Sequence, residues 1–387
     1  MSSIPWDDLA EEDGYVKPDY EGGALDEQEL FWRDHQEWLQ DRGYMLRPRY
    51  RPDWVPSWKD KPDVYWLLCE DGQRRTWRSN MDATRISDGV RVLMKCVIKS
   101  EHPYEVEIAT FLSSEPLAAN PQNHCIPIYD VLEVLDDPDK TILVMPLTRG
   151  FNRPRFQTVG EAIDFFSQFF EGLQFMHKHH VAHRDCGRMN IMMEGTMYPN
   201  GWHPTQDSMK PDFTFYRKNE IYSRTERPPK YYLIDFGISR RYDPAQGPPL
   251  EDPINGGDKT VPEHQGRKGI IPCNPFFTDI YYAGNMIRTE FLEVMFLSNS
   301  SFQKKNEFNF IADLVRDMVQ DDPTQRPTMD QVVVRFETIR KKLSNIKLRS
   351  RISPRDESIV MAFFRTLPHI FRSIKYPLQR YPAVPSR

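Results

Sequence analysis

The chain has 387 residues, 39% of them apolar, which is enough for one large domain or two modest ones with an ample core. Its five cysteines are scattered without a CxxC pair, which argues against disulfides and zinc and favours a reducing compartment. The net charge is −5, no apolar run reaches the roughly 18 residues of a membrane span, and the acidic start lacks the apolar core of a signal peptide. We therefore expect a cytoplasmic or nuclear protein without a membrane span.

Charge is concentrated at the two ends of the chain. Residues 1–30 carry ten Asp and Glu against one Lys, whereas residues 340–387 carry twelve Lys and Arg against two acids. A basic tail is compatible with nucleic acid, with an anionic membrane, or with a solvated end that docks on an acidic surface. We favour the last interpretation and do not expect nucleic acid as a partner. Residues 1–59 are predicted to be an acidic N-terminal extension and residues 346–387 a basic C-terminal tail.

The first half of the chain is predicted to contain mainly strands. A Trp-rich helical stretch at 26–39 comes first, with Trp32 and Trp38 as candidates to pack on the domain behind it. After it, β-branched and aromatic residues bounded by turn residues indicate strands, and Pro103 opens a short helix. The predicted elements are a strand at 64–68, a turn at Asp88-Gly89, a return strand at 90–97, a helix at about 104–112, and strands at 126–134 and 141–145.

The second half is predicted to be mostly helical. Thr158 and Glu161 form a capping box ahead of a helix that ends near residue 180 and has one apolar face. Thr328 caps a last helix that ends near residue 343.

Two short motifs carry the chemistry. In the first, Asp185 is followed five residues later by Asn190; in the second, Asp235 opens an Asp-Phe-Gly turn after an apolar run. Phosphoryl transfer needs one carboxylate to accept the proton of the substrate hydroxyl, and an amide with a second carboxylate to hold the metal ion that shields the phosphates. The pattern predicts Asp185 as the base and Asn190 and Asp235 as ligands of Mg²⁺.

These motifs resemble those of the eukaryotic protein kinases, over about residues 60–345. Three later segments also resemble that family: its Ala-Pro-Glu, its Asp-x-Trp-Ser-x-Gly helix start and its Arg-Pro segment, a set that aminoglycoside and choline kinases lack. The resemblance implies an α+β fold with two lobes, a small β-rich N-lobe and a larger helical C-lobe, and a buried structural pair of Glu263 and Arg326. The three later segments are 261–263, 279–284 and 322–327.

The resemblance also implies a phosphate-binding lysine. Lys95 ends the fragment 92–95, which is similar to the family's strand three, where a lysine contacts the α and β phosphates and pairs with a glutamate of the following helix. Glu105 is the preferred partner because apolar residues three and seven positions later would bury that contact. Glu107 is the alternative.

An adenine-binding hinge is implied by residues 141–148, with Met145 as the gatekeeper. In the family, adenine bonds one backbone C=O just after the gatekeeper and one backbone N–H two residues further on. Proline lacks N–H but keeps its C=O, so Pro146 can accept and Thr148 can donate.

Several departures from the family put the activity in question. No G-x-G-x-x-G loop lies between residues 63 and 95. Gly187 stands where serine/threonine kinases carry a lysine for the γ-phosphate, and Arg188 is a candidate to replace it. Gly256 and Lys259 stand at the usual Thr and Tyr positions of the activation segment. This set resembles the divergent kinase-like proteins expanded in filamentous and mushroom-forming fungi.

The connection between the two motifs, residues 194–230, is long, whereas the family has a short hairpin there. It is polar, proline-rich and without sustained periodicity, so we predict an exposed loop that buries little surface.

Because the base, the metal ligands and Lys95 all persist, the sequence favours an ATP- and Mg²⁺-dependent kinase that phosphorylates Ser or Thr of a protein substrate. Tyrosine specificity is disfavoured because the Ala-Ala-Arg form of the catalytic loop is absent. The alternative is a weak or inactive pseudokinase that serves as a nucleotide- or protein-binding scaffold. The sequence gives no indication of the oligomeric state.

Overall fold

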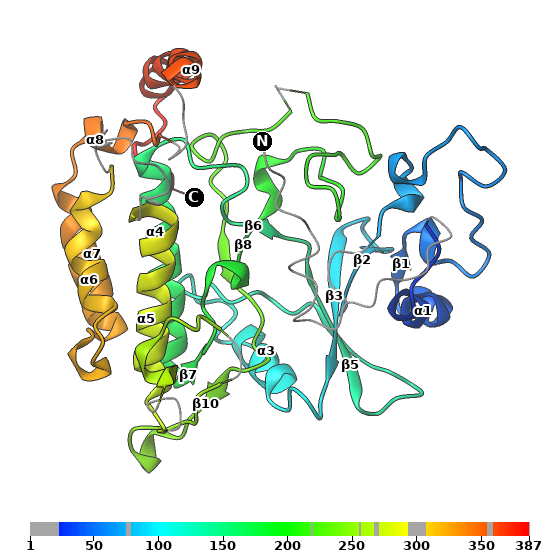
Figure 1. The fold of residues 1–387 in the computed structure, drawn as a ribbon, viewed down its shortest axis with the longest axis horizontal. Coiled ribbons are helices and arrows are strands. Elements are labelled where there is room, and N and C mark those ends of the chain that lie inside the picture. The colour runs from blue at the N-terminus through cyan, green and yellow to red at the C-terminus, as the bar shows by residue number, and fades with distance from the viewer. Residues whose placement is uncertain are drawn as a thin grey trace. The chain divides into compact units, whose positions relative to one another are not determined.

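The computed structural model describes residues 23–74, 79–217, 220–254, 257–266, 271–292, 307–353 and 359–386. The fold is mixed α+β with an antiparallel, curled sheet. Its residues form two compact units (Figure 1), one made of residues up to Val92 with 202–215 and the other of 93–201 with 216–387. The expected division at residues 59 and 345 stays a prediction, and Gly256 lies outside the described residues.

The first unit begins with the predicted helical stretch, which is confirmed as two short helices. Asp26 accepts hydrogen bonds from the N–H groups of Gln28 and Glu29, and Glu29 accepts one from Asp26 in return, which is a complete capping box. Trp32 is 1% exposed and forms part of the unit's core, whereas Trp38 is half-buried. The elements are α1 (Glu27–Asp34), α2 (Gln36–Asp41), β1 (Tyr44–Leu46) and β2 (Asn80–Arg85), and β1 and β2 pair antiparallel.

The predicted strand at 64–68 is wrong. Residues Trp66–Leu68 form a 3₁₀ turn, because the N–H groups of Leu68 and Cys69 bond carbonyl groups three residues earlier in the chain. Leu68 is 75% exposed, so the apolar run that suggested a strand does not line a core. The strand that precedes the turn at Gly89 is instead β2, and Gly89 has a φ of +72°, which favours glycine.

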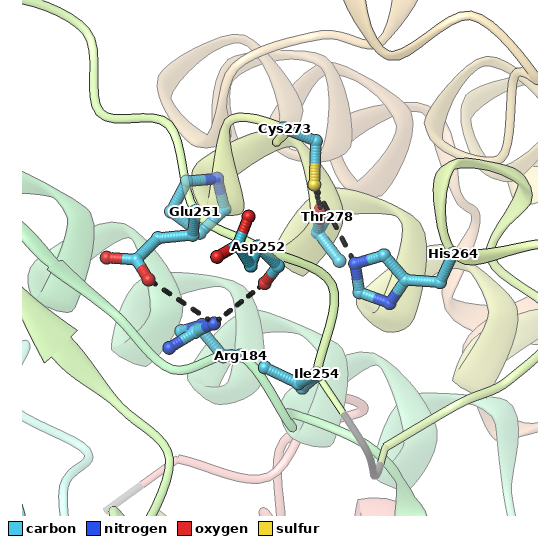
Figure 2. A pocket seen from close by; sticks show the side chains of 8 residues that line it. Arg184, Glu251, Asp252, Ile254, His264, Cys273 and Thr278 are labelled. Atoms are coloured by element: carbon cyan, nitrogen blue, oxygen red, sulfur yellow. Dashed lines mark hydrogen bonds and ion pairs between the residues drawn. The ribbon is translucent and has the colours of Figure 1, made fainter. Parts of the chain in front are cut away.

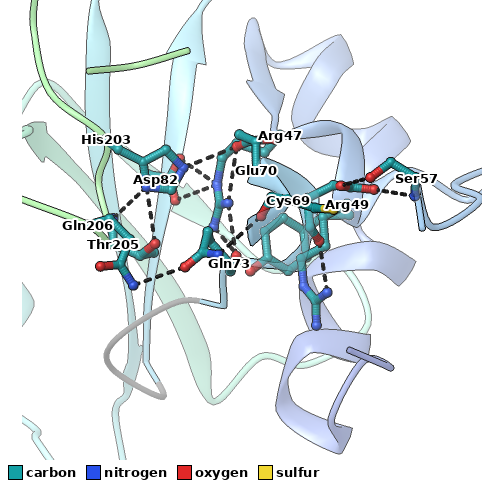
Figure 3. Close-up of polar contacts among 12 residues, drawn as sticks. Arg47, Arg49, Ser57, Cys69, Glu70, Gln73, Asp82, His203, Thr205 and Gln206 are labelled. Carbon is teal, nitrogen blue, oxygen red and sulfur yellow. Dashed lines mark hydrogen bonds and ion pairs between the residues drawn. The ribbon is translucent and has the colours of Figure 1, made fainter. Parts of the chain in front are cut away.

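Charged side chains are buried at the centre of the first unit (Figure 3). Arg47 donates to Asp82, with Nε–Oδ1 of 3.1 Å, and to the carbonyl oxygen of Gln73. The imidazole of His203 is fully buried and lies 3.2 Å from Glu70. Since His203 belongs to the 194–230 segment, this network binds part of that segment to the first unit.

The prediction that residues 194–230 bury little surface is therefore wrong. Trp202 and His203 are buried in the first unit, and Met197, Tyr198 and Arg224 are buried in the second. Arg224 donates to the hydroxyl of Tyr231 and to the carbonyl oxygen of Phe151. The segment lacks periodicity because it is anchored by single side chains rather than by the face of a helix or strand.

The sheet of the second unit has the order β3-β5-β4, with β4 and β5 antiparallel. The predicted return strand, the short helix and the strand at 141–145 are confirmed, while β4 is shorter than the predicted strand at 126–134. These elements are β3 (Arg91–Ile98), α3 (Glu105–Ser113), β4 (Asp130–Glu133) and β5 (Lys140–Pro146).

Helices make up the rest of the second unit. Thr158 caps α4 by accepting from the N–H of Glu161, as predicted, but the carboxylate of Glu161 accepts from the N–H of Gln157 rather than from that of Thr158, so the predicted capping box is only half formed. Thr328 caps α7, as predicted, and Gln331 completes a capping box there. Helix α4 is buried along most of its length by aromatic side chains, for example Phe165, which stacks on Phe151 with ring centroids 4.5 Å apart. In Figure 1 α4, α5, α6 and α7 run side by side. The helices are α4 (Val159–Lys178), α5 (Pro275–Ile287), α6 (Ala312–Met318), α7 (Met329–Lys342), α8 (Asn345–Arg349) and α9 (Ile359–Leu378).

Short strands form small antiparallel sheets in the second unit. Strand β8 pairs antiparallel with both β6 and β9, and β7 pairs antiparallel with β10. Among the described helices, none combines the length and the apolar composition needed to cross a bilayer. The remaining strands are β6 (Arg149–Gly150), β7 (Val181–Ala182), β8 (Ile191–Met193), β9 (Tyr231–Leu233) and β10 (Arg240–Arg241).

Candidate active site

Three charged side chains from three separate elements meet in the second unit. Lys95, in the middle of β3, forms an ion pair with Glu105 at the start of α3. Its Nζ also lies 2.8 Å from Oδ1 of Asp235, which follows β9. Glu105 is the partner of Lys95, and Glu107 is exposed. The glutamate that was preferred from helical spacing is therefore the one that the fold brings to the lysine.

Asp185 and Asn190 are joined directly. The amide nitrogen of Asn190 donates to Oδ2 of Asp185 at 2.8 Å and to the carbonyl oxygen of Asp185 at 2.9 Å. Both partners are acceptors, so the amide must present its nitrogen to them. The amide oxygen of Asn190 is then the atom left to face a ligand.

The β8–β9 hairpin brings these two motifs together although they are far apart in the chain. Ile191 and Leu233 are opposite each other in this pair, and the N–H of Ile234 donates to the carbonyl oxygen of Asn190 at 3.0 Å. Asn190 precedes one strand and Asp235 follows the other, so antiparallel pairing places them at the same end of the hairpin. The 194–230 segment lies between the two strands and does not alter this register.

A buried carboxylate whose role sequence analysis did not assign holds the backbone of residues 183–184. Asp279 of α5 is 0% exposed and accepts from the backbone N–H groups of His183 (2.8 Å) and Arg184 (2.7 Å). His177 of α4 lies 2.9 Å from the same carboxylate. A motif at 279–284 had been noticed, but its aspartate could only be assigned this function once α5 was seen to pack beside the loop.

His183 has a structural position. Its ring is buried against Phe236, with centroids 5.7 Å apart, and its Nε2 lies 3.1 Å from the carbonyl oxygen of Ile234. Burial lowers the pKa of His183, so the ring is held neutral.

Electrostatics separate the two aspartates of the site. Burial, followed by the charge of Asp235, raises the pKa of Asp185 to about 7, although the hydrogen bond from Asn190 opposes this shift. For Asp235, burial is outweighed by Lys95, which holds the pKa of that carboxyl below its usual range. Burial alone would lower the pKa of Lys95, but Glu105 and Asp235 raise it. The site thus combines a fixed cation, a fixed anion and a carboxyl group that can exchange a proton near neutral pH.

Gly237 fits between these groups because it has no side chain. A Cβ at this position would lie 3.0 Å from Nδ1 of His102 and 3.2 Å from Oε2 of Glu105. The backbone of Gly237 instead approaches closely enough for its carbonyl oxygen to contact His102 at 3.2 Å. A side chain at this position of the Asp-Phe-Gly turn would therefore press on His102 and Glu105.

The donor set suits a hard divalent cation. The hydrogen bonds of Asp235 within the described residues go to its Oδ1, and 47% of its side chain is exposed. Oδ2 of Asp235 and the amide oxygen of Asn190 are therefore available, and oxygen ligands of this kind are those that Mg²⁺ prefers.

Arg188 is not brought to this group. Its side chain is 53% exposed, and its Nε lies 3.3 Å from Glu290, which also accepts from Asn152. Pro146 ends β5 and Thr148 precedes β6, as expected for a connecting segment. Their suggested contacts with adenine stay predictions.

Arg184 lines a small pocket beside the catalytic loop (Figure 2). Its NH2 lies 3.6 Å from Glu251 and 3.4 Å from the carbonyl oxygen of Asp252. On the opposite wall, Sγ of Cys273 lies 3.7 Å from Nε2 of His264. Burial raises the pKa of the Cys273 thiol, so this cysteine is not activated as a nucleophile.

The implied pair of Glu263 and Arg326 is present and bidentate. The two N···O distances are 2.7 and 2.6 Å, and the side chains are 8% and 0% exposed, respectively. Thr278 of α5 also donates to Glu263. This cluster fastens the segment after residue 261 to the start of α5.

No known family model matches the chain, and a search among curated proteins gives no significant match.

Proposed function

We propose that the protein is an ATP- and Mg²⁺-dependent protein kinase acting on Ser or Thr hydroxyl groups. The observation that carries the proposal is the arrangement of Lys95 between Glu105 and Asp235, in the same unit as the bonded pair Asp185–Asn190. In an α+β fold of this kind we infer the two-lobed kinase architecture, with residues 60–345 as the kinase-like domain. This inference rests on the order and the contacts of the motifs.

Each side chain then has a defined part in the reaction. Lys95 would neutralise the α and β phosphates and keep its orientation through Glu105. Asp185 would accept the proton of the acceptor hydroxyl, a task suited to a carboxyl whose pKa is about 7. Bound Mg²⁺, held by Asn190 and Asp235, would supply charge neutralisation at the β and γ phosphates. The backbone oxygen of Pro146 and N–H of Thr148 would orient adenine.

The absence of a glycine-rich loop makes the metal ion and Lys95 more important. In the first unit β1 and β2 are joined by residues 47–79, in which Gly72 is the only glycine. Fewer side-chain-free backbone amides are then available to cover phosphates, so we expect nucleotide affinity to depend strongly on the divalent cation.

A second candidate function is a pseudokinase scaffold. It is favoured by the position of Arg188, because the guanidinium proposed to replace the missing lysine is paired with Glu290 instead. Such a protein would bind nucleotide or a protein partner without transferring phosphate.

Two measurements on the purified chain separate these functions. Radiolabelled phosphate from ATP should be transferred to casein or to the chain itself, and Asp185→Asn should abolish this transfer. ATP should raise the melting temperature with Mg²⁺ present, and this rise should vanish with EDTA or in Asp235→Ala. Mg²⁺-dependent stabilisation without transfer would favour the scaffold, while equal stabilisation without any divalent cation would contradict the metal site.

A further inference from the structure

Helix α9 is held on the second unit by one of its faces. The hydroxyl of Tyr376, which is 4% exposed, lies 2.8 Å from Oγ of Ser223, and Lys375 forms an ion pair of 2.9 Å with Glu226. The chain after the helix is fixed as well, because Arg349 donates to the carbonyl oxygen of Tyr381. These contacts set the rotation of α9 about its own axis.

The opposite face of α9 is apolar and exposed. Its large side chains recur at helical spacing and cover about a third of the helix circumference, a typical amphipathic pattern. Each has between 52% and 79% of its surface exposed. They are Phe363, Phe364, Leu367, Phe371, Ile374 and Leu378. Exposed apolar strips of this size mark interaction surfaces rather than ordinary solvent-facing helix.

Cations lie beside this strip, and acids are scarce in the sequence around it. Lys375 borders the strip on α9, where it also pairs with Glu226, and the exposed Arg380 follows the helix. Residues 340–387 contain twelve Lys and Arg but only two acids. A helix with aromatic and aliphatic side chains on one side and cations at its margins matches the chemistry of an anionic lipid surface, where the apolar strip enters the acyl region and the cations meet phosphate groups.

We propose that α9 lies in the surface of an anionic membrane and thereby docks the protein there. The strip faces away from the Tyr376 contacts, and in Figure 1 α9 lies at an end of the second unit, beyond α4 and α8. Nucleic acid fits less well, because it would bind cations and leave six apolar side chains in water. A second copy of the chain would bring the cations of the two helices together. The inference goes beyond the proposed kinase function and does not depend on it.

Sedimentation with lipid vesicles tests the proposal on the full chain. The protein should sediment with phosphatidylcholine vesicles that contain phosphatidylserine, much less with phosphatidylcholine alone, and less as salt is added. Phe371→Glu should reduce partitioning by about tenfold or more, because it would place a charge where the exposed aromatic ring would enter the acyl region. Leu378→Glu should act in the same way, and Arg380→Gln more weakly.

Leu135→Glu is the matched control, because Leu135 is 73% exposed in the same unit but lies far from α9 in the chain, after β4. It should leave partitioning unchanged, and all variants should keep the melting temperature of the parent. Failure to sediment with anionic vesicles, or equal sedimentation of Phe371→Glu and Leu378→Glu with the parent, would overturn the proposal. A dimer that both variants dissociate, without vesicle binding, would assign the strip to a second copy, and RNA binding lost only with Arg380 would assign the charge to nucleic acid.

Discussion

Asp185 lies where burial and the neighbouring charge of Asp235 both oppose its ionisation, and its pKa is about 7. The folded protein therefore binds this proton more tightly than the unfolded chain does. The stability that the bound proton contributes is present below about pH 4 and is lost as the pH rises to about 7. Ionisation of Asp185 therefore lowers the stability of the folded protein, and it also produces the carboxylate that would act as the base.

Asp185→Asn should consequently stabilise the protein at alkaline pH. The side chain of the variant cannot ionise, so at about pH 8 its free energy of unfolding should exceed that of the parent by about 2 kcal/mol, and its melting temperature should be higher. At about pH 5 the difference should be smaller. Thermal denaturation without nucleotide at the two pH values measures the effect. A difference that does not change with pH would mean that the carboxyl is not perturbed in the folded protein.

Lys95→Met should remove nucleotide binding and also destabilise the fold. Glu105 is 2% exposed and its Oε2 has no hydrogen-bond partner among the described residues, so loss of Lys95 leaves a buried carboxyl without compensation. We expect a loss of about 3 kcal/mol or more at neutral pH and no Mg²⁺-ATP stabilisation. Lys99→Met is the control. It removes an exposed ion pair with Glu133, so the free energy of unfolding should fall by less than about 1 kcal/mol. An unchanged ATP response in Lys95→Met would exclude Lys95 from the site.

The residues of the site that could be predicted are those in contiguous motifs. The spacing within short motifs identified the candidates Asp185, Asn190 and Asp235. The apolar periodicity of the helix after Lys95 selected Glu105 as the partner of that lysine. Asp279 and Glu290 could not be assigned in the same way, because their contacts with the catalytic loop join residues about a hundred positions apart. Such contacts depend on where α5 packs, which no local pattern specifies.

At the scale of elements, one buried ion pair fastens a loop to a helix. Arg326 gives both of its terminal nitrogens to Glu263 and one further bond to the carbonyl oxygen of Phe277 at the start of α5. Either partner alone would leave a charge inside the protein. The pair therefore fixes the segment after residue 261 rather than simply adding attraction.

Arg326→Ala should lower the free energy of unfolding by about 3–5 kcal/mol, because Glu263 remains buried without its partner. Arg335→Ala provides a control of the same chemistry at the surface, where Arg335 and Asp317 are 41% and 36% exposed and the loss should be below about 1 kcal/mol. Urea denaturation compares the two variants. Equal losses would show that burial does not decide the strength of the pair.

Helices and hairpin strands were predictable because each repeats a pattern over several residues. The caps at Thr158 and Thr328 open α4 and α7, and a run of strand-forming residues after the turn at Gly89 predicted β3. The failures fell on segments fixed by single contacts. Residues 66–68 are apolar without forming a strand, and the 194–230 segment buries Trp202 and Arg224 without any periodic face.

On the scale of the whole molecule, the 194–230 segment contributes to both units. Within this segment, buried attachment points alternate with exposed stretches. Arg217 is exposed, whereas Arg224 is 1% exposed and donates to Tyr231. The segment is thus attached at both ends and open in its middle.

Limited trypsin digestion should cut after Arg217 and spare Arg224, because proteolysis requires an accessible backbone and local unfolding. Mass spectrometry of the first fragments identifies the site. Cleavage after Arg224 at the same rate would indicate that the buried attachment is lost in solution. Arg224→Gln, which loses the charged donor to Tyr231, should then make the whole segment more sensitive.

The register of the β8–β9 pair has a topological consequence. The N–H of Glu194 bonds the carbonyl oxygen of Lys230 at 2.8 Å, so the chain departs from the hairpin and rejoins it at one pair of facing residues. Arg224 within this segment still donates to Tyr231 of β9, but the length of the segment can vary at little cost, because the entropy of closing such a loop grows only slowly with its length. Residues could be inserted between Glu194 and Lys230, or new termini created there, while the hydrogen bond between Asn190 and Ile234 is kept. This position therefore suits insertions or circular permutation.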